Sequence, residues 1–169
     1  MRAMAEIWEL VDERKRKTGI LHERSRSEQI PHGFYHIVVE IWTKTPDGKI
    51  LLTQRSPEKP MGLLWECTMG SILVGEDSLD GAVRELAEET GISAKKEDLI
   101  FLGDTFHTNW IMDSYLYLPK EQPSLCLQPE EVCDAKFVPV DEVALCSDTL
   151  TPKVWEHFCK YKDKIIAYR

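Results

Sequence analysis

The sequence predicts a domain of the α/β class, in which strands and helices share one core. Two runs rich in β-branched and aromatic residues, at positions 34–42 and 110–118, are typical of buried strands. Apolar residues recur at helical spacing in the stretch before Gly91, and again at positions 151–168 near the C-terminus. A chain of 169 residues with 43% hydrophobic content is long enough to bury a core, so we expect one domain over residues 1–169.

Charge and composition exclude several classes of function. The formal net charge of −8 argues against a surface for polymeric nucleic acid or for a membrane, although a bound divalent metal would still allow a nucleotide substrate. No apolar run approaches the ~20 residues of a membrane span. The N-terminus reaches Glu6 and Glu9 without the apolar segment of a signal peptide. The five cysteines form no CxxC pair, so we expect reduced, mostly buried thiols in a cytoplasmic protein. The sequence leaves a homodimer open.

Residues 1–30 are predicted to form an N-terminal β-hairpin extension. The segment MAEIWELVDE favours a strand, the polar stretch RKRKTG favours a turn, and ILH favours a returning strand. The basic residues at positions 14–17 are interpreted as a solvated hairpin tip, with a phosphate-binding patch as the alternative.

The central elements follow from turn residues and from periodicity. Residues 34–42 and 49–54 are predicted to pair as a hairpin around the turn Pro-Asp-Gly at 46–48. A helix is predicted to begin at Asp77 or Ser78 and to end at Gly91. The remaining predicted elements are strands at 98–103 and 110–118, a loop at 120–128, a short helix from 141, and a C-terminal helix at 151–168.

The helix that ends at Gly91 carries three carboxylates on one face. Glu85, Glu88 and Glu89 are spaced i, i+3 and i+4, and such neighbours raise one another's pKa unless a cation neutralises them. Arg84 lies four residues before Glu88 and can form an ion pair with it, which offsets only part of the repulsion among the three carboxylates. Oxygen ligands on one face suit a hard cation such as Mg²⁺ or Mn²⁺. Taken alone, this face is either a metal site or a solvated acidic surface.

The whole stretch from 70 to 92, GSILVGEDSLDGAVRELAEETGI, decides between these interpretations. Gly70 is followed after five residues by Glu76, and after seven more residues by RELAEETGI. This matches the Nudix box at all nine defined positions over 23 residues, so the chain resembles the Nudix hydrolases. The resemblance implies an α/β/α sandwich with a mixed β-sheet. It also implies metal-dependent hydrolysis of a diphosphate bond in a nucleoside diphosphate linked to another group.

The resemblance further implies roles for individual residues. Glu85, Glu88 and Glu89 would bind one or more Mg²⁺ or Mn²⁺ ions, and the residue before the box glycine, Met69, would offer its backbone carbonyl to a metal. An arginine after the second core strand often lies near the substrate phosphates. Arg55 is therefore either a substrate-binding residue or part of a structural ion pair.

The catalytic candidates come from the box and from a later segment. The water's proton would be accepted by Glu85, or by Glu131 in a stretch that resembles the family's late EExxxxxFVP segment, with Glu130 as the second choice there. Glu76 would orient the site or bind metal indirectly. Arg84 would hold the acidic side chains by ion pairing.

Two alternative functions remain to be weighed. The N-terminal EIWxLxDE…TG pattern resembles a Nudix subgroup related to isopentenyl-diphosphate isomerase. Those isomerases have a catalytic cysteine before the box glycine and a metal-binding histidine after it, whereas this chain has Met69 and Ser71, and Cys67 lies two residues too early. Isomerase activity is therefore disfavoured. A nucleotide-sensing domain without turnover usually lacks box glutamates, and none is missing here. The substrate itself stays open, because loops outside the box determine it.

Overall fold

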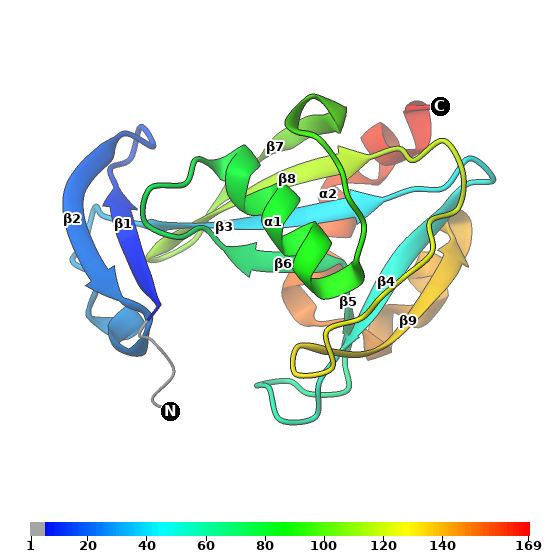
Figure 1. The fold of residues 1–169 in the computed structure, drawn as a ribbon, viewed down its shortest axis with the longest axis horizontal. Helices are drawn as coiled ribbons and strands as arrows, with labels where there is room; N and C mark the ends of the chain where they lie inside the picture. The colour runs from blue at the N-terminus through cyan, green and yellow to red at the C-terminus, as the bar shows by residue number, and fades with distance from the viewer. Residues whose placement is uncertain (1–5) are drawn as a thin grey trace.

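The computed structural model describes residues 6–169, coloured along the chain in Figure 1. Its helices are α1 (Ser78–Thr90) and α2 (Pro152–Ala167), with the shorter 3₁₀ helices η1 (Arg24–Gln29), η2 (Lys96–Asp98) and η3 (Val140–Thr149). Its strands are β1 (Ile7–Val11), β2 (Lys17–Glu23), β3 (His36–Thr43), β4 (Lys49–Arg55), β5 (Trp65–Glu66), β6 (Thr68–Ser71), β7 (Leu99–Phe106), β8 (Trp110–Tyr117) and β9 (Val132–Pro139).

A four-stranded mixed sheet forms the centre of the molecule, in the order β6-β3-β8-β7. β3 runs parallel to β8 and antiparallel to β6, and β7 is antiparallel to β8. A second, antiparallel sheet has the order β5-β4-β9. The aromatic and β-branched run of β3 suits its place between two neighbours, where both of its faces are covered.

Alternate residues of β3 serve two different layers. Val39 and Ile41 pack with Leu86 of α1, whereas Trp42 packs on the opposite face with Phe158 of α2. Figure 1 shows α1 in front of the central sheet and α2 behind it. The period of two along one strand thus builds an α/β/α sandwich, which confirms the predicted fold class.

The prediction that residues 34–42 and 49–54 pair as a hairpin is wrong. The turn exists, with Gly48 N–H donating to the Thr45 carbonyl at 2.9 Å. Beyond it, however, β3 and β4 share only the isolated bridge between Lys44 and Ile50. Because β6 and β8 occupy both hydrogen-bonding edges of β3, β4 turns away and pairs with β5 and β9 in the second sheet.

Both ends of α1 agree with their prediction. Asp77 is the N-cap, and its carboxylate accepts from the backbone N–H of Asp80; the Asp80 carboxylate in turn accepts from the backbone N–H of Asp77. Gly91 ends the helix in the left-handed conformation, with φ of 75°, where a side chain would be strained.

The N-terminal hairpin is confirmed as β1 and β2, which lie beside the main body in Figure 1. The carbonyl of Ile7 accepts from the Val74 N–H at 3.1 Å, which joins β1 to the loop before α1. The interpretation of residues 14–17 as a solvated tip is wrong for Lys15. Its Nζ lies 2.5 Å from the buried Asp113 carboxylate, so the hairpin tip is attached to β8.

The cysteines differ in part from their prediction. All five are unpaired, as expected, but only Cys67 is buried, Cys146 is half-buried, and the other three are exposed because they lie on outward faces and in the loop after β8. In residues 6–169, no helix is long and apolar enough to cross a membrane.

Candidate active site

The candidate active site begins where α1 passes over β6. A Cβ atom at position 70 would overlap the carboxyl group of Glu85, and one at position 81 would crowd the side chain of Ile72. Glycine at these two positions therefore lets the helix lie directly on the strand and brings the Glu85 carboxylate against the backbone of β6. This close approach is the physical reason for a glycine at the start of the box.

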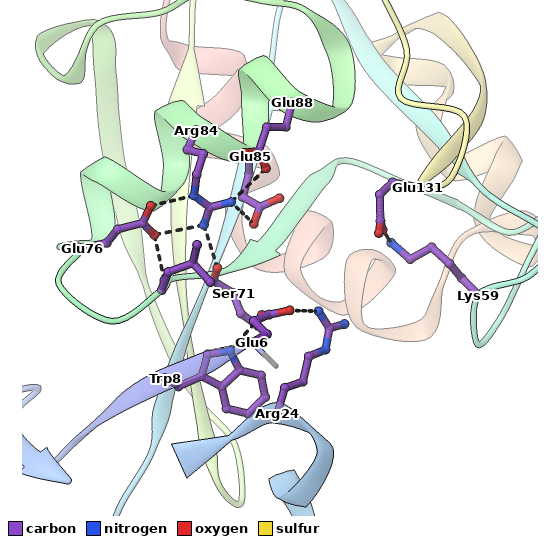
Figure 2. A network of polar contacts seen from close by, with 11 residues as sticks. Glu6, Trp8, Arg24, Lys59, Ser71, Glu76, Arg84, Glu85, Glu88 and Glu131 are labelled. Carbon is purple, nitrogen blue, oxygen red and sulfur yellow. Dashed lines mark hydrogen bonds and ion pairs between the residues drawn. The ribbon is translucent and has the colours of Figure 1, made fainter. Parts of the chain in front are cut away.

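Arg84 links the acidic residues of the box, as Figure 2 shows. Its Nε donates to Glu76 at 2.6 Å, and its Nη1 donates to Glu85 at 2.7 Å and to Glu88 at 3.1 Å. Its Nη2 also donates to the Ser71 carbonyl at 3.0 Å. One guanidinium thus holds three carboxylates and the end of β6 in a single network, which is wider than the expected brace on Glu88.

The three box carboxylates differ in their burial. The side chain of Glu88 is half exposed, that of Glu85 is 14% exposed, and Glu89 is 2% exposed. Burial raises the pKa of Glu85 to about 7, although Arg84 acts in the opposite direction. Burial also raises the pKa of Glu89 well above its ordinary value, and the nearby Glu66 and Glu85 carboxyls add to this effect. Among the described residues, Glu89 Oε2 has no hydrogen-bond partner.

Glu131 reaches the same place from a distant part of the chain. The loop after β8 follows the end of α1, with the backbone N–H of Cys126 donating to the Thr90 carbonyl at 2.8 Å and that of Gln128 to the Glu89 backbone carbonyl at 3.3 Å. This loop ends just before β9, where the Glu131 carboxylate forms an ion pair with Lys59 of the β4–β5 loop. Figure 2 places this pair across from the box carboxylates.

A cavity of about 600 Å³ joins these groups. Its wall includes the predicted metal-binding and catalytic residues Glu85, Glu88, Glu89, Arg84 and Glu131, together with Met69. Glu76 does not line this cavity and acts on it through Arg84. Glu130, the second choice for the base, is also outside the wall. A separate, mainly apolar cavity of about 470 Å³ lies between the hairpin and the start of α1 and contains none of the three box carboxylates.

Arg55 forms a structural ion pair, which was one of the two roles expected for it. Its Nη1 lies 2.9 Å from both oxygens of the buried Glu66, and its Nε donates to the Pro60 carbonyl at 2.9 Å. Arg55 nevertheless lines the cavity, so contact with a substrate stays a prediction. The same holds for the Met69 carbonyl as a metal ligand.

The carboxylate oxygens of the cavity wall are suitable ligands for a hard divalent cation. Within residues 6–169, no three carboxylate, histidine or cysteine side chains form a preassembled metal site. Arg84 explains this, because its guanidinium draws Glu85 and Glu88 to itself. Yet the donors are all oxygens, and Glu89 offers a buried oxygen without a partner. A cation of charge +2 is the group that would satisfy that oxygen and lower the raised pKa values.

Comparison with known proteins agrees with this geometry. Residues 34–158 match the NUDIX domain. The chain belongs to the Nudix hydrolase family. An uncharacterized Nudix hydrolase of Listeria monocytogenes is 33% identical over 147 residues, which cover 82% of each chain. The CTP pyrophosphohydrolase of Escherichia coli is 30% identical over 105 residues, covering 56% of this chain and 78% of the relative. The chain is therefore a hydrolase with pyrophosphohydrolase relatives.

A solved structure shares the fold of this chain over almost its whole length. The crystal structure of DR0079 from Deinococcus radiodurans superposes on this chain with a TM-score of 0.74 at 17% identity. The match covers 92% of this chain and 98% of DR0079. At this identity the likeness concerns the fold alone.

Sequence reasoning missed three groups at the Nudix site. Lys59 pairs with Glu131, while Glu6 and Arg24 of the hairpin line the same cavity. The charge of Lys59 in the loop after Arg55 was a usable signal, because loops beside the box contact the substrate. For Glu6 and Arg24 the sequence held no signal, since their approach to the box depends on how the hairpin lies against it.

Proposed function

We propose that this chain hydrolyses a diphosphate bond in a nucleoside diphosphate linked to another group, with Mg²⁺ or Mn²⁺ as cofactor. The observation that carries the proposal is the meeting of Glu85, Glu88 and Glu89 with Glu131 around one cavity. With Glu6, five carboxylates line this cavity, and one of them has an unpartnered buried oxygen, so the cavity is a poor site for an anion unless cations accompany it. A diphosphate with divalent cations matches that requirement.

Glu85, Glu88 and Glu89 would hold the metal, and the Met69 carbonyl would add a neutral oxygen. When bound, the cation supplies neutralisation of the diphosphate charge and activation of the attacking water. Arg84 keeps Glu85 and Glu88 near each other before a cation arrives, because it already contacts both. Glu76 fixes Arg84 in turn, through contacts of 2.6 and 3.0 Å.

Two carboxylates remain candidates for the proton acceptor. In the metal-free protein burial raises the pKa of Glu85 to about 7, and a bound cation would lower it, so that Glu85 would be ionised and able to accept a proton near neutral pH. Glu131 is more exposed and would first have to release Lys59. Lys59 would then be available to the substrate phosphates. Arg55 would assist from the same wall, with Glu66 holding its guanidinium in place.

The relatives support a small nucleotide derivative as the substrate class. The E. coli relative named above is a CTP pyrophosphohydrolase, and its match includes 56% of this chain. Which nucleotide derivative this chain accepts is a question for a substrate panel.

Isomerase activity has less support than hydrolysis. The thiol that lies three residues before the box glycine, Cys67, is fully buried, and burial raises its pKa well above the ordinary value. A nucleophile or acid at a substrate must reach the substrate, and Cys67 instead packs in the core beneath α2. The sensing alternative is disfavoured because every box glutamate is present.

The test is turnover of a panel of nucleoside triphosphates, nucleotide sugars, ADP-ribose and dinucleoside polyphosphates, with Mg²⁺, with Mn²⁺ and with chelator. We expect metal-dependent cleavage of at least one compound. Glu88→Gln and Glu89→Gln should each lower kcat by about 100-fold or more, since removal of single electrostatic groups typically costs that much. The control is Glu97→Gln, an exposed glutamate outside the cavity. Turnover near that of the wild type in both box variants would refute the assignment.

A further inference from the structure

The N-terminal hairpin forms one side of the candidate active site. Glu6 and Ile7 at the start of β1, together with Arg24 after β2, line the same cavity as the box carboxylates. In Figure 2 the hairpin lies below Ser71, whereas the Lys59–Glu131 pair lies to the right of the box carboxylates. The hairpin and the β4–β5 loop therefore bring basic side chains to different sides of the acidic site.

Among the contacts that hold the hairpin against the main body, two lie beside the box. At one end, the Ile7 carbonyl accepts from the Val74 N–H in the box loop. At the other end, Lys15 pairs with Asp113, which also accepts from the Ser78 hydroxyl at 2.6 Å. The first contact joins the hairpin to the loop before α1 and the second joins it to the first residue of the helix, so the hairpin keeps its place relative to the box.

Arg24 is oriented by a series of contacts within the hairpin. Its Nη1 donates to Glu6 Oε2 at 2.6 Å, and Glu6 Oε1 accepts from the Trp8 indole N–H at 2.9 Å. The indole is buried and stacks on His36 with ring centroids 3.8 Å apart. A surface ion pair alone stabilises a fold very little, but this one ends in a rigid aromatic stack and so gives Arg24 a defined direction.

Arg24 also has the most hydrogen-bonding capacity to spare among the basic residues of the cavity wall. Of its five N–H groups, only one on Nη1 has a partner among residues 6–169. The other basic side chains there are engaged: Arg55 with Glu66 and Pro60, Lys59 with Glu131, and Arg84 with Glu76, Glu85, Glu88 and Ser71. Arg24, whose side chain is 60% exposed, is thus ready to receive an anion.

We propose that Arg24 is a specificity-determining residue, which binds a further phosphate of the substrate beyond the scissile diphosphate. The proposal rests on the proposed function, which places the scissile diphosphate and its cations at Glu85, Glu88 and Glu89. An additional phosphate would meet an acidic cavity and needs a cation of its own. The planar guanidinium binds phosphate through two parallel hydrogen bonds, and Arg24 offers it from the hairpin side. The substrate class is accordingly a nucleotide with three or more linked phosphates.

The experiment titrates the 169-residue chain with one of two inorganic probes, tripolyphosphate or pyrophosphate, in the presence of Mg²⁺, and measures binding by calorimetry. In Arg24→Ala, tripolyphosphate should bind about 10- to 100-fold more weakly, because a charged hydrogen-bonded contact is lost, while pyrophosphate affinity changes less than about threefold. Arg24→Lys keeps the charge without the planar donors and should give an intermediate loss for tripolyphosphate. The matched control is Arg16→Ala, which removes another hairpin arginine that is paired with Asp12 and lies outside the cavity.

Three results would overturn the proposal. The first is unchanged tripolyphosphate affinity in Arg24→Ala, and the second is an equal loss of affinity for both probes in that variant. The third is a selective loss of tripolyphosphate affinity in Lys59→Ala but not in Arg24→Ala. Unfolding midpoints of all variants exclude a general loss of structure as the cause. Because probe binding requires no hydrolysis, absence of turnover in the wild-type panel would refute the proposed function separately.

Discussion

Glu85 should make the metal-free protein less stable as the pH rises, and substitution by glutamine should remove this effect. Burial raises the pKa of Glu85 to about 7 in the folded state, compared with an ordinary value of 4.5. Between these values the folded state keeps the proton that the unfolded state has lost, so stability falls as pH rises from 4.5 to 7. The full difference corresponds to about 3 kcal/mol above pH 7.

The wild type alone cannot isolate this contribution. Burial lowers the pKa values of His36 and His107 to about 4, so these residues make stability rise with pH across an overlapping window. The comparison of Glu85→Gln with the wild type removes their contribution, because both proteins contain both histidines. The variant and the wild type should be nearly equal at pH 4.5, and the variant should be more stable by about 3 kcal/mol at pH 8.

The assay is urea unfolding at several pH values between 4.5 and 8, in chelator and then with excess Mg²⁺. Added cation should stabilise the wild type at pH 8 by about 3 kcal/mol at 100 times its Kd, and stabilise the variant much less, because the variant lacks one ionised ligand. A stability difference between the two proteins that does not change with pH, or a variant that is less stable at pH 8, would refute the reasoning.

Three further predictions concern the site's glycine and two buried polar contacts of the scaffold. Gly70→Ala places a methyl group on the Glu85 carboxyl, so we expect turnover to fall by about 100-fold with α1 still folded, as measured by kinetics and circular dichroism. His157→Ala removes the partner of one oxygen of the fully buried Glu40, 2.9 Å away, while Ser114 and Trp42 keep their hydrogen bonds to the other oxygen. The substitution should cost about 3 kcal/mol in chemical unfolding, and a loss below about 1 kcal/mol would contradict this. Lys44→Met removes three hydrogen bonds to backbone carbonyls at the end of α2, and should lower stability by about 2 kcal/mol, with fraying of that helix in hydrogen exchange.

Local features were predictable because short-range geometry determines them. The caps of α1 at Asp77 and Gly91, and the common face of Glu85 and Glu88, follow from the helical period and from side-chain and backbone preferences within a few residues. The hairpin strands and the central strands also followed from alternation and turn residues. The exact spacing of the box indicated the family, and with it the α/β/α architecture.

Contacts between distant segments were decided by the tertiary structure. The turn at 46–48 predicted that the strands on either side would pair, but a strand has only two edges, and β6 and β8 had taken both edges of β3. The meeting of Glu131 with Lys59, and of Arg24 with the box cavity, depends in the same way on where loops and the hairpin lie. The acidic face of α1 follows from the sequence, because residues that are neighbours on a helix face are close in the chain. The charges that surround this face come from distant segments, so they depend on how the chain crosses between the sheets.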